Sequence, residues 1–412
     1  MAFTPPPVLP SALPRLFADL EEELHALDAQ GLRRQLTTIE AVDGPLVRMD
    51  GRDVVCWCSN DYLGLSRHPA LVHAACRAAT EWGVGARSSR LLSGTTRAHQ
   101  DLESALAAWF DAEDAIVFAS GYVTNLGVLG ALASSEDVIV IDRLAHASLI
   151  DAARATRAQL LVFRHNDPSH AGQLLSRTAK SRRRFLVTEG VFSMDGDRAP
   201  LVELLEVAQR HEAVIYLDDA HGAFVLGATG RGSPEAAGIS HESFLYMGTL
   251  GKALGCQGGF AVGPRTLIDL LHNRARAFIY ATALAVPVAA AALEALRVLA
   301  RESERRLTLQ ERARQLHTRL RAINATSLAV PSHIVPVVLG ETARVVWLAQ
   351  RLLEQGMWAP AIRPPTVPKG SARLRLSVTA LHTKTHVDAL VRALKEYGVR
   401  NSEFVAGSQG TA

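Results

Sequence analysis

The sequence of 412 residues lacks the features that mark a membrane or secreted protein. No apolar run approaches the roughly 18 residues that a membrane-spanning helix needs, because the Ala-rich segment 281–300 contains Pro287, Glu294 and Arg297. We expect a packed helix there. The chain opens with MAFTPPPVLPSALPRLF, in which no basic segment precedes an apolar core. These two absences predict a cytoplasmic protein.

Cysteine is also scarce, and its four positions show no repeated CxxC spacing. Cys56 and Cys58 are the one close pair, and without further Cys or His partners such a pair is more typical of buried thiols than of a metal site. We therefore expect reduced cysteines and no metal.

A strong charge of either sign is lacking as well. The net charge is only +3, so nothing indicates nucleic acid or a membrane surface as a partner, while anionic small molecules remain open. Apolar residues make up 48% of the chain and charged residues 21%, an ordinary composition for a soluble protein. The length suffices for a large core and roughly two or three domains.

Short apolar runs alternate with helical patterns over about residues 70–263. This alternation predicts an α/β fold with a mostly parallel sheet covered on both faces. The predicted strands are 115–118, 138–141, 160–163, 185–188, 214–217, 244–247 and 260–262, and helical patterns between them include 98–110, 174–180 and 201–211.

The sequence before and after this alternation predicts further structural elements and domains. Residues 16–36 have the pattern of an amphipathic helix with acids early and Arg33 and Arg34 late, and residues 46–57 suggest a hairpin around Asp50-Gly51. After Pro287 we expect helices to about residue 323, strands at 334–339 and 374–379, and helices at 344–355 and 384–397. The predicted units are an N-terminal arm (1–58), a large domain (59–287), a smaller C-terminal α/β domain (288–400) and a disordered tail (401–412).

Polar side chains follow the predicted strands at the point where each strand ends. Ligands of open α/β sheets bind at this edge, so the sequence predicts a site there. The residues are Ser120, Gly121, Tyr122, Asp142, His146, Glu189, Asp218, His221, Thr249 and Lys252.

Lys252 is the only ionisable group in the segment FLYMGTLGKALGCQGGFAV, residues 244–262. A lysine held between apolar segments tends to have a lowered pKa, which makes its amine nucleophilic and suits Schiff-base chemistry. The alternative for this segment alone is a surface lysine in a Gly-rich loop.

Asp218 and His221 belong to the sequence DDAH that follows a predicted strand. An aspartate at the end of a buried strand can keep a heteroaromatic nitrogen protonated, which makes the ring a strong electron acceptor. The alternative is a helix-capping Asp with a partly buried His.

Three further positions fit a phosphorylated ring. Ser120-Gly121-Tyr122 opens a helix whose amides could hold a phosphate, His146 could lie over an aromatic ring, and the Ser193 hydroxyl could meet a ring oxygen. Taken singly, these residues are also typical of an ordinary turn, a solvated helix start and a turn serine. Together with the lysine and the aspartate, however, they specify pyridoxal 5'-phosphate (PLP).

The chain resembles the α-oxoamine synthase family of fold-type I PLP-dependent transferases over about residues 27–393. The resemblance rests on many motifs in the family's order. They are SNDYLGL (59–65), SGYxxN (120–125), DRLAHASLIDA (142–152), HND (165–167), TEGVFSMDGDRAPL (188–201), LDDAHG (217–222), TLGKALG (249–255) and AIRPPTVPKGSARLRLSVTALHT (361–383).

The resemblance implies roles for individual residues. Lys252 would bind the cofactor covalently, Asp218 would pair with the pyridine nitrogen, His221 and Ser193 would meet the phenolic oxygen, and His146 would stack on the ring. The full set of implied cofactor contacts is Gly121, Tyr122, His146, Ser193, Asp218, His221, Thr249, Lys252 and, from a neighbouring subunit of a homodimer, Thr282. The implied substrate contacts are Arg33, Asn60, His146, Thr366 and Arg375.

The implied reaction is a decarboxylative condensation of an amino acid with an acyl thioester. The sequence IRPPTVP at 362–368 favours the branch of the family that joins L-alanine to pimeloyl-CoA, or to a pimeloyl-carrier protein, in biotin biosynthesis. The alternatives are a glycine acetyltransferase, a 5-aminolevulinate synthase, a serine-using synthase, or a non-catalytic relative, which should lack Lys252.

One departure concerns the segment GARSSR at 85–90. Arg87 and Ser88 stand where the family has glycines beside the expected substrate channel, so backbone freedom is lost and a charge is added. This puts the identity of the acyl chain in doubt.

Overall fold

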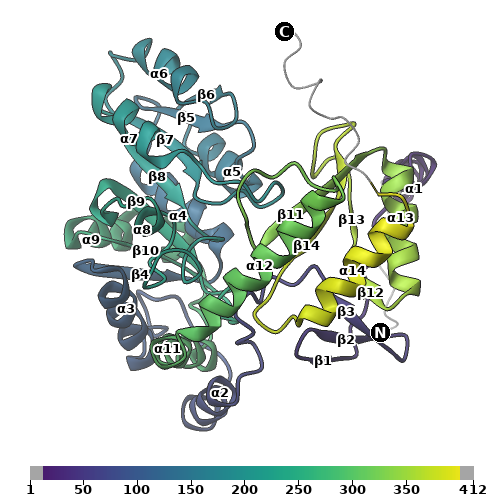
Figure 1. Cartoon of the computed structure of the whole chain (residues 1–412). Helices are drawn as coiled ribbons and strands as arrows, with labels where there is room; N and C mark the ends of the chain where they lie inside the picture. The colour runs from purple at the N-terminus through teal and green to yellow at the C-terminus, as the bar shows by residue number, and fades with distance from the viewer. Residues whose placement is uncertain (1–12, 400–412) are drawn as a thin grey trace, which may run out of the picture.

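A seven-stranded sheet forms the larger body of the computed structural model, which describes residues 13–399 (Figure 1). Its strands are β4 (Asp114–Phe118), β5 (Val138–Asp142), β6 (Gln159–Phe163), β7 (Arg184–Glu189), β8 (Val214–Asp218), β9 (Phe244–Thr249) and β10 (Gly259–Gly263). The strand order is β4-β10-β9-β8-β7-β5-β6, and β10 is antiparallel to both its neighbours while the other pairs are parallel. All seven predicted strands and the mostly parallel sheet are confirmed.

Helices cover both faces of this sheet. One face carries α4 (Gly121–Leu132), α5 (Ala147–Ala155), α9 (Arg265–Arg274) and α10 (Arg276–Ile279). The opposite face carries α3 (Arg97–Phe110), α6 (Pro168–Ser176), α7 (Leu201–Arg210) and α11 (Val286–Arg301). The short α8 (Ser233–Ala236) and the 3-10 turn η1 (His241–Ser243) precede β9, and α2 (Pro69–Trp82) packs against α11.

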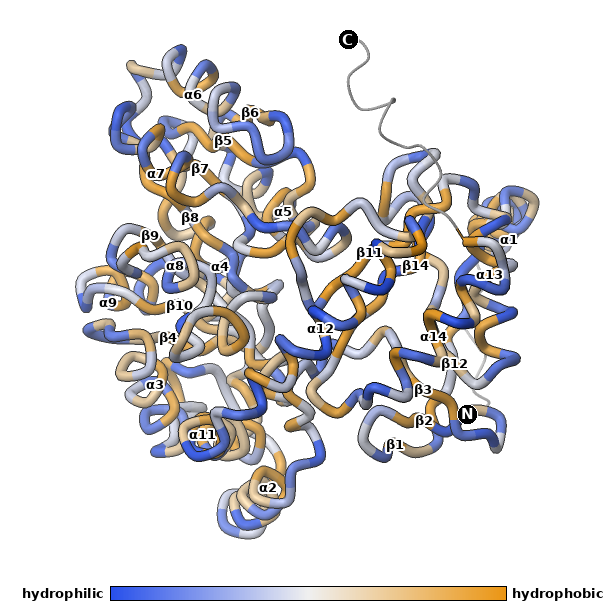
Figure 2. The backbone as a smooth tube through the Cα atoms, in the orientation of Figure 1, coloured by the Kyte–Doolittle hydropathy of each residue, from blue (hydrophilic) through white to orange (hydrophobic). Residues whose placement is uncertain are grey.

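Burial in β5 shows why the sequence pattern is continuous instead of alternating. Val138, Ile139, Val140 and Ile141 are all fully buried, because helices lie on both sides of the strand. Figure 2 shows the same apolar character along the strands of the large sheet.

The smaller body combines the two ends of the described chain (Figure 1). One of its sheets has the order β1-β2-β3-β12 and the other β11-β14-β13. These strands are β1 (Ala41–Asp43), β2 (Leu46–Met49), β3 (Arg52–Cys56), β11 (Ile334–Gly340), β12 (Met357–Trp358), β13 (Ala361–Ile362) and β14 (Ala372–Ser377). Helices α13 (Thr342–Glu354) and α14 (Lys384–Glu396) complete this body.

The predicted hairpin is confirmed as β2 and β3, with Asp50 and Gly51 at positive φ in the turn. The hairpin pairs through β3 with β12 in parallel, so the N-terminal segment belongs spatially with the C-terminal one. The boundaries proposed for the domains stay a prediction.

Two long helices connect the bodies. The predicted packed helix at 281–300 is confirmed as α11, which begins at Val286 with Pro287 in its first turn. The following α12 (Glu304–Ala322) crosses between the two bodies and is largely hydrophilic (Figures 1 and 2). Across residues 13–399, no helix combines the length and apolarity needed to cross a membrane.

The predicted helix at 16–36 is wrong at its C-terminal end, because α1 is Leu13–Ala29. Gly31 adopts a positive φ, which ends the helix, and the Arg363 guanidinium binds the carbonyl oxygens of Gly31 and Arg33 at 2.6 and 2.7 Å. Arg363, more than 300 residues away in the chain, therefore holds residues 31–33 in a non-helical conformation although their sequence has helical periodicity.

The predicted helix at 174–180 is also misplaced, since α6 spans Pro168–Ser176. Its start is set by Asp167, whose carboxylate accepts a hydrogen bond from the His170 amide at 2.9 Å, and by Pro168 in the first turn. The predicted tail at 401–412 lies outside the described residues.

Candidate active site

Four strands of the large sheet end in a polar side chain. Asp142 ends β5, Glu189 ends β7, Asp218 ends β8 and Thr249 ends β9. Parallel strands bring these ends to one edge, as the sequence predicts. A cavity of about 160 Å³ lies there, lined by Gly121, Tyr122, Asn125, His146, Ser148, Glu189, Asp218, Ala220, His221, Met247, Thr249 and Lys252.

Lys252 follows β9 and reaches this cavity, with Nζ 2.7 Å from His221 Nε2. Loss of hydration around the amino group lowers its pKa to about 8, although Asp218 and Glu189 oppose the shift. The predicted nucleophilic lysine therefore shares one cavity with the predicted ring-nitrogen carboxylate, and a substantial fraction of its amine is neutral near pH 8.

A network of hydrogen bonds fixes the Asp218 carboxylate. Asn125 Nδ2 donates to one carboxylate oxygen at 2.8 Å, and the Ala220 amide donates to the other at 3.0 Å. Asn125 is itself held by the Tyr216 hydroxyl at 2.7 Å and by Ser148 Oγ at 2.8 Å. Because its orientation is set on several sides, the carboxylate is preorganised to face a cation in the cavity.

His221 links the lysine to the N-terminal segment of the chain. Its Nδ1 lies 2.6 Å from the Tyr62 hydroxyl, while its Nε2 faces Lys252. Burial, together with the nearby charges of Lys252 and Arg375, holds the pKa of His221 well below its ordinary value. The imidazole is therefore neutral and can relay a hydrogen bond.

His146 forms the N-cap of α5, as the sequence predicts. Its amide donates to Glu189 Oε1 at 2.7 Å, and its Nδ1 lies 2.7 Å from Ser148 Oγ. Burial lowers the pKa of His146, against the attraction of Asp218, so the ring is uncharged and suited to stacking. Burial and the neighbouring Asp218 raise the pKa of Glu189 well above its ordinary value.

The start of α4 closes another side of the cavity. Ser120 is the N-cap and accepts the Val123 amide at 3.2 Å, so the earlier amides, those of Gly121 and Tyr122, have no acceptor within the helix. A side chain at Gly259 would come within 2.7 Å of Gly121 Cα, so β10 approaches this turn as closely as only glycine permits.

Next to the cavity, Arg375 of β14 is nearly buried, at 7% exposed. Its Nε donates to the Ser193 carbonyl, its Nη1 donates to Ser377 Oγ at 2.7 Å, and both terminal nitrogens lie 3.3 Å from Asn60 Oδ1. Within residues 13–399 the guanidinium forms no ion pair with an acidic side chain. A nearly buried cation without an acid is suited to binding a substrate carboxylate.

Seven predicted cofactor contacts line the cavity together. They are Gly121, Tyr122, His146, Asp218, His221, Thr249 and Lys252. Asn60, Ser193 and Arg375 form the adjoining cluster, where Ser193 contributes its carbonyl oxygen to Arg375. Their roles in binding and catalysis stay predictions.

The structure places three predicted residues outside this cavity. Arg33 pairs with Asp28 at 2.6 Å, and it is Arg34 whose guanidinium meets Thr366 Oγ1, at 2.9 Å. Thr282 is exposed and forms an isolated β-bridge with Ser89. Ser89 belongs to the segment 85–90, which differs from the family pattern. Contacts of these residues with substrate or a second subunit stay predictions.

Four residues of the site were not predicted to contact cofactor or substrate: Tyr62, Asn125, Ser148 and Glu189. All four occur inside quoted motifs, namely SNDYLGL, SGYxxN, DRLAHASLIDA and TEGVFSMDGDRAPL, and Glu189 was also named as a polar residue that follows the predicted strand 185–188. Their position in those motifs is the sequence signal that could have identified them as residues of the site.

At position 87 the backbone retains the glycine-like conformation despite the arginine. Arg87 has a φ of 68°, in the left-handed region where non-glycine residues are uncommon. The predicted loss of backbone freedom is therefore accompanied by strain at this residue.

The fold and the site define a class of protein. Residues 52–394 match the Aminotransferase class I and II family, and the chain belongs to that family. It is a PLP-dependent transferase with the fold-type I architecture.

Individual relatives narrow the class. The chain is 46% identical to the 8-amino-7-oxononanoate synthase of Anaeromyxobacter dehalogenans over 372 residues, covering 90% of this chain and 93% of the relative. It is also 46% identical to the enzyme of that name from Bordetella petrii, covering 93% and 98%.

Solved structures agree on the fold. A serine palmitoyltransferase variant from S. paucimobilis with a bound PLP–myriocin aldimine aligns with a TM-score of 0.88 at 31% identity, covering 93% of this chain and 98% of that one. The 8-amino-7-oxononanoate synthase of Francisella tularensis aligns with a TM-score of 0.72 at 29% identity, covering 84% and 98%.

The residues of the cavity fit PLP. Lys252, with its lowered pKa, could supply the amine for the aldehyde, and the fixed Asp218 carboxylate could pair with a ring nitrogen. The two amides that open α4 supply donors for a phosphate.

Proposed function

We propose that the protein condenses L-alanine with a pimeloyl thioester, either pimeloyl-CoA or a pimeloyl-carrier protein, to give 8-amino-7-oxononanoate and CO₂ in biotin biosynthesis. The observation that carries this proposal is Arg375, a nearly buried guanidinium without an acidic partner, beside the cavity that contains Lys252. Relatives at 46% identity support the choice of reaction. We place the enzyme in the cytoplasm.

Arg375 and Asn60 bind and orient the amino-acid carboxylate in this proposal. The planar guanidinium can form two parallel hydrogen bonds to a carboxylate, which fixes the direction of the Cα substituents. The bond that breaks at Cα could thereby be held at a defined angle to the cofactor ring.

PLP, when bound, supplies an electron-accepting ring that stabilises a carbanion next to the amino group. Asp218 would keep a proton on the ring nitrogen of the bound cofactor, and His146 would cover its ring. Lys252 removes the Cα proton, since an amine with a pKa of about 8 is a competent base near neutral pH. His221, neutral and 2.7 Å from Nζ, keeps the amine oriented.

The spectrum of the purified protein tests the assignment of the lysine. The wild-type protein loaded with PLP should be yellow, and Lys252→Ala should lose the visible absorbance of lysine-bound cofactor. Lys369→Ala, at an exposed position, is the matched control and should keep the wild-type spectrum. An unchanged spectrum in Lys252→Ala would contradict the assignment.

A substrate panel tests the reaction. CoA release with L-alanine plus pimeloyl-CoA should exceed release with glycine plus acetyl-CoA or succinyl-CoA. A second candidate is a serine-using synthase, which the TM-score of 0.88 to serine palmitoyltransferase favours, so serine plus palmitoyl-CoA belongs in the panel. A higher rate for that pair would move the proposal to the second candidate.

We also propose a homodimer in which Thr282 of one subunit contacts the cofactor phosphate of the other. Thr282 is exposed in the single chain, as this role requires. Mixing inactive Lys252→Ala and Thr282→Ala chains should restore part of the activity, because one site of each mixed dimer is then intact. If the mixture stays inactive, or sedimentation shows a monomer, the shared site is excluded.

A further inference from the structure

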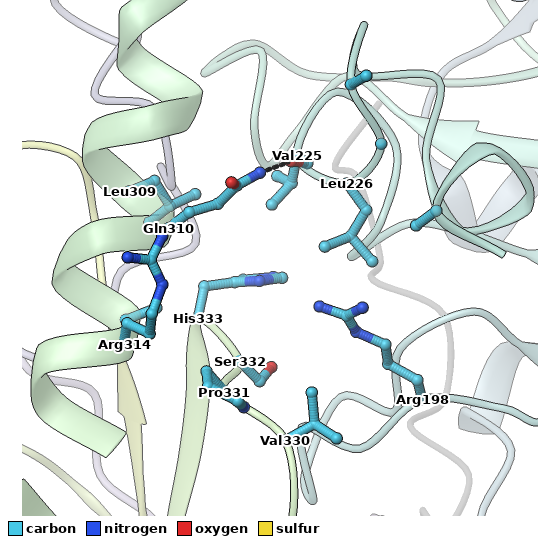
Figure 3. Close-up of a pocket in the computed structure, with 14 residues that line it drawn as sticks. Arg198, Val225, Leu226, Leu309, Gln310, Arg314, Val330, Pro331, Ser332 and His333 are labelled. Carbon is cyan, nitrogen blue, oxygen red and sulfur yellow. Dashed lines mark hydrogen bonds between the residues drawn. The ribbon is translucent and has the colours of Figure 1, made fainter. Parts of the chain in front are cut away.

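A second cavity, of about 400 Å³, lies between α12 and the loops that follow β7 and β8 (Figure 3). It shares no lining residue with the cavity of about 160 Å³ that contains Asp218 and Lys252, which we call the cofactor cavity. Its lining is Arg198, Val225, Leu226, Gly227, Ala228, Ala236, Leu309, Gln310, Ala313, Arg314, Val330, Pro331, Ser332 and His333. This lining contains two arginines and no carboxylate.

His333, the residue before β11, points into the cavity (Figure 3). It is only 3% exposed, and its Nε2 has no hydrogen-bond partner within residues 13–399. Burial, with the charges of Arg375 and Arg198, lowers the pKa of His333 to about 3, so the ring is neutral. A buried ring nitrogen without a partner costs free energy that a ligand would recover.

Arg198 faces His333 across the cavity (Figure 3). Its backbone is fixed by a bridge with Val191 and by a hydrogen bond from Asn166 to its carbonyl oxygen. Its guanidinium has no hydrogen bond or ion pair with another side chain among the described residues, whereas Arg314 is paired with Glu311 at 2.6 Å. Arg198 is therefore the cation that a bound anion would meet.

Apolar side chains form part of the remaining lining, beside Gln310, Arg314 and Ser332. Val225, Leu226 and Leu309 form a nearly buried floor, and Val330, 54% exposed, is the apolar side chain that faces water. A bare inorganic anion would leave Val330 in contact with water, whereas an aliphatic chain would cover it and remove its own methylenes from water.

We propose that this cavity binds a small aliphatic carboxylate, with its head between Arg198 and His333 and its chain against the apolar wall. The ligand would bridge the two bodies, because Arg198 follows β7 in the larger body and His333 precedes β11 in the smaller one. It would also lie one layer behind the cofactor cavity: the His333 ring packs on Tyr62 with centroids 4.3 Å apart, and Tyr62 contacts His221. This site is independent of the reaction proposed above.

Calorimetric titration of the full-length, PLP-loaded protein tests the chemistry of the ligand. Hexanoate should bind saturably, acetate more weakly, and hexanol or hexylammonium not at all. The absence of saturable hexanoate binding would overturn the proposal. Equal affinities for hexanoate, acetate and sulfate would overturn the aliphatic class of ligand.

Variants test the location. Arg198→Gln should weaken hexanoate binding about tenfold, since it removes a charge-assisted hydrogen bond. Arg210→Gln, on the exposed side of α7, is the matched control and should bind as the wild type does. Wild-type affinity in Arg198→Gln would overturn the assigned site.

A second pair of variants, both at Val330, tests the location of the site without changing Arg198. Val330 is 54% exposed, so its substitution should leave folding intact. Val330→Asp should bind hexanoate several-fold more weakly than Val330→Asn, because only the former places a like charge beside the carboxylate. Equal affinities would contradict the site, as would displacement of hexanoate by saturating L-alanine, which would place hexanoate in the cofactor cavity.

Discussion

The cofactor cavity and the neighbouring Arg375 cluster are built in different ways. Asp218, His221 and Lys252 come from consecutive strand ends of one sheet. The cluster joins Asn60 and Arg375, which lie 315 residues apart in the chain, and it adds the Ser193 carbonyl from the loop that follows β7. The cavity therefore contains the groups suited to chemistry, and the cluster contains the group suited to binding a carboxylate.

This comparison predicts that substitutions in the two regions affect different kinetic constants. The largest effect is expected for Asp218→Asn, because the ring nitrogen then loses the carboxylate that keeps it protonated. kcat should fall about 10²–10³-fold, with little change in the KM for the amino acid. Steady-state kinetics measure both constants.

Asp269→Asn, on the exposed face of α9, serves as the control and should be fully active. A wild-type kcat in Asp218→Asn would contradict the chemical role that we assign to Asp218.

The next effect concerns Arg375→Lys, which keeps the charge but loses the planar pair of donors. The KM for the amino acid should rise about tenfold or more, with a smaller change in kcat. Arg392→Lys, exposed on α14, should have wild-type kinetics. If kcat falls and KM stays constant, the division between the two regions is wrong.

A third prediction concerns the stability of the loop after β7, which contains Ser193 and Asp197 and lies between the cofactor cavity and the Arg375 cluster. His165 lies between Asp142, at the end of β5, and Asp197, at 2.9 and 2.8 Å, and Asp197 belongs to the loop that carries Ser193. Burial opposes a charge on His165, but the hydrogen bonds to the two carboxylates outweigh it and raise the pKa from 6.5 to about 10.

Since the folded pKa is raised, the stabilisation is complete below about pH 6.5 and is lost as the pH rises through about 10. His165→Gln should lower the free energy of unfolding by about 3 kcal/mol at pH 7, and the difference from wild type should shrink above pH 10. Urea unfolding at both pH values measures it. His73→Gln, exposed on α2, should match the wild type, and a pH-independent difference in His165→Gln would contradict the charged histidine.

The smallest effect is expected at the N-terminal segment. Arg34 reaches Thr366 and Arg33 pairs with Asp28, and both arginines are exposed. Arg34→Ala should raise the KM for the acyl thioester about two- to fivefold, in line with the modest energies of exposed polar contacts. Arg33→Ala is the matched comparison, and a larger effect there would support the role that family resemblance assigns to Arg33.

The strands of the large sheet could be predicted because both of their faces are buried, which produces continuous apolar runs such as 138–141. The ends of α1 and α6 could not be predicted from periodicity. Arg363 captures the carbonyls of Gly31 and Arg33, and Asp167 caps α6 before its apolar pattern begins. In both cases a few specific contacts decide the boundary, namely the positive φ of Gly31 with the two Arg363 hydrogen bonds at α1 and the Asp167 cap at α6, and hydrophobic periodicity does not reveal them.

The sequence by itself determined the α/β alternation, the polar strand ends and the position of Lys252 directly after a strand, because local periodicity and the polarity of strand ends are properties of neighbouring residues. Only the tertiary structure placed Asn60 against Arg375, joined the N-terminal hairpin to β12, and left Arg198 and His333 facing one cavity. These arrangements join segments far apart in the chain: the first two form within the smaller body, and the third forms between the two bodies.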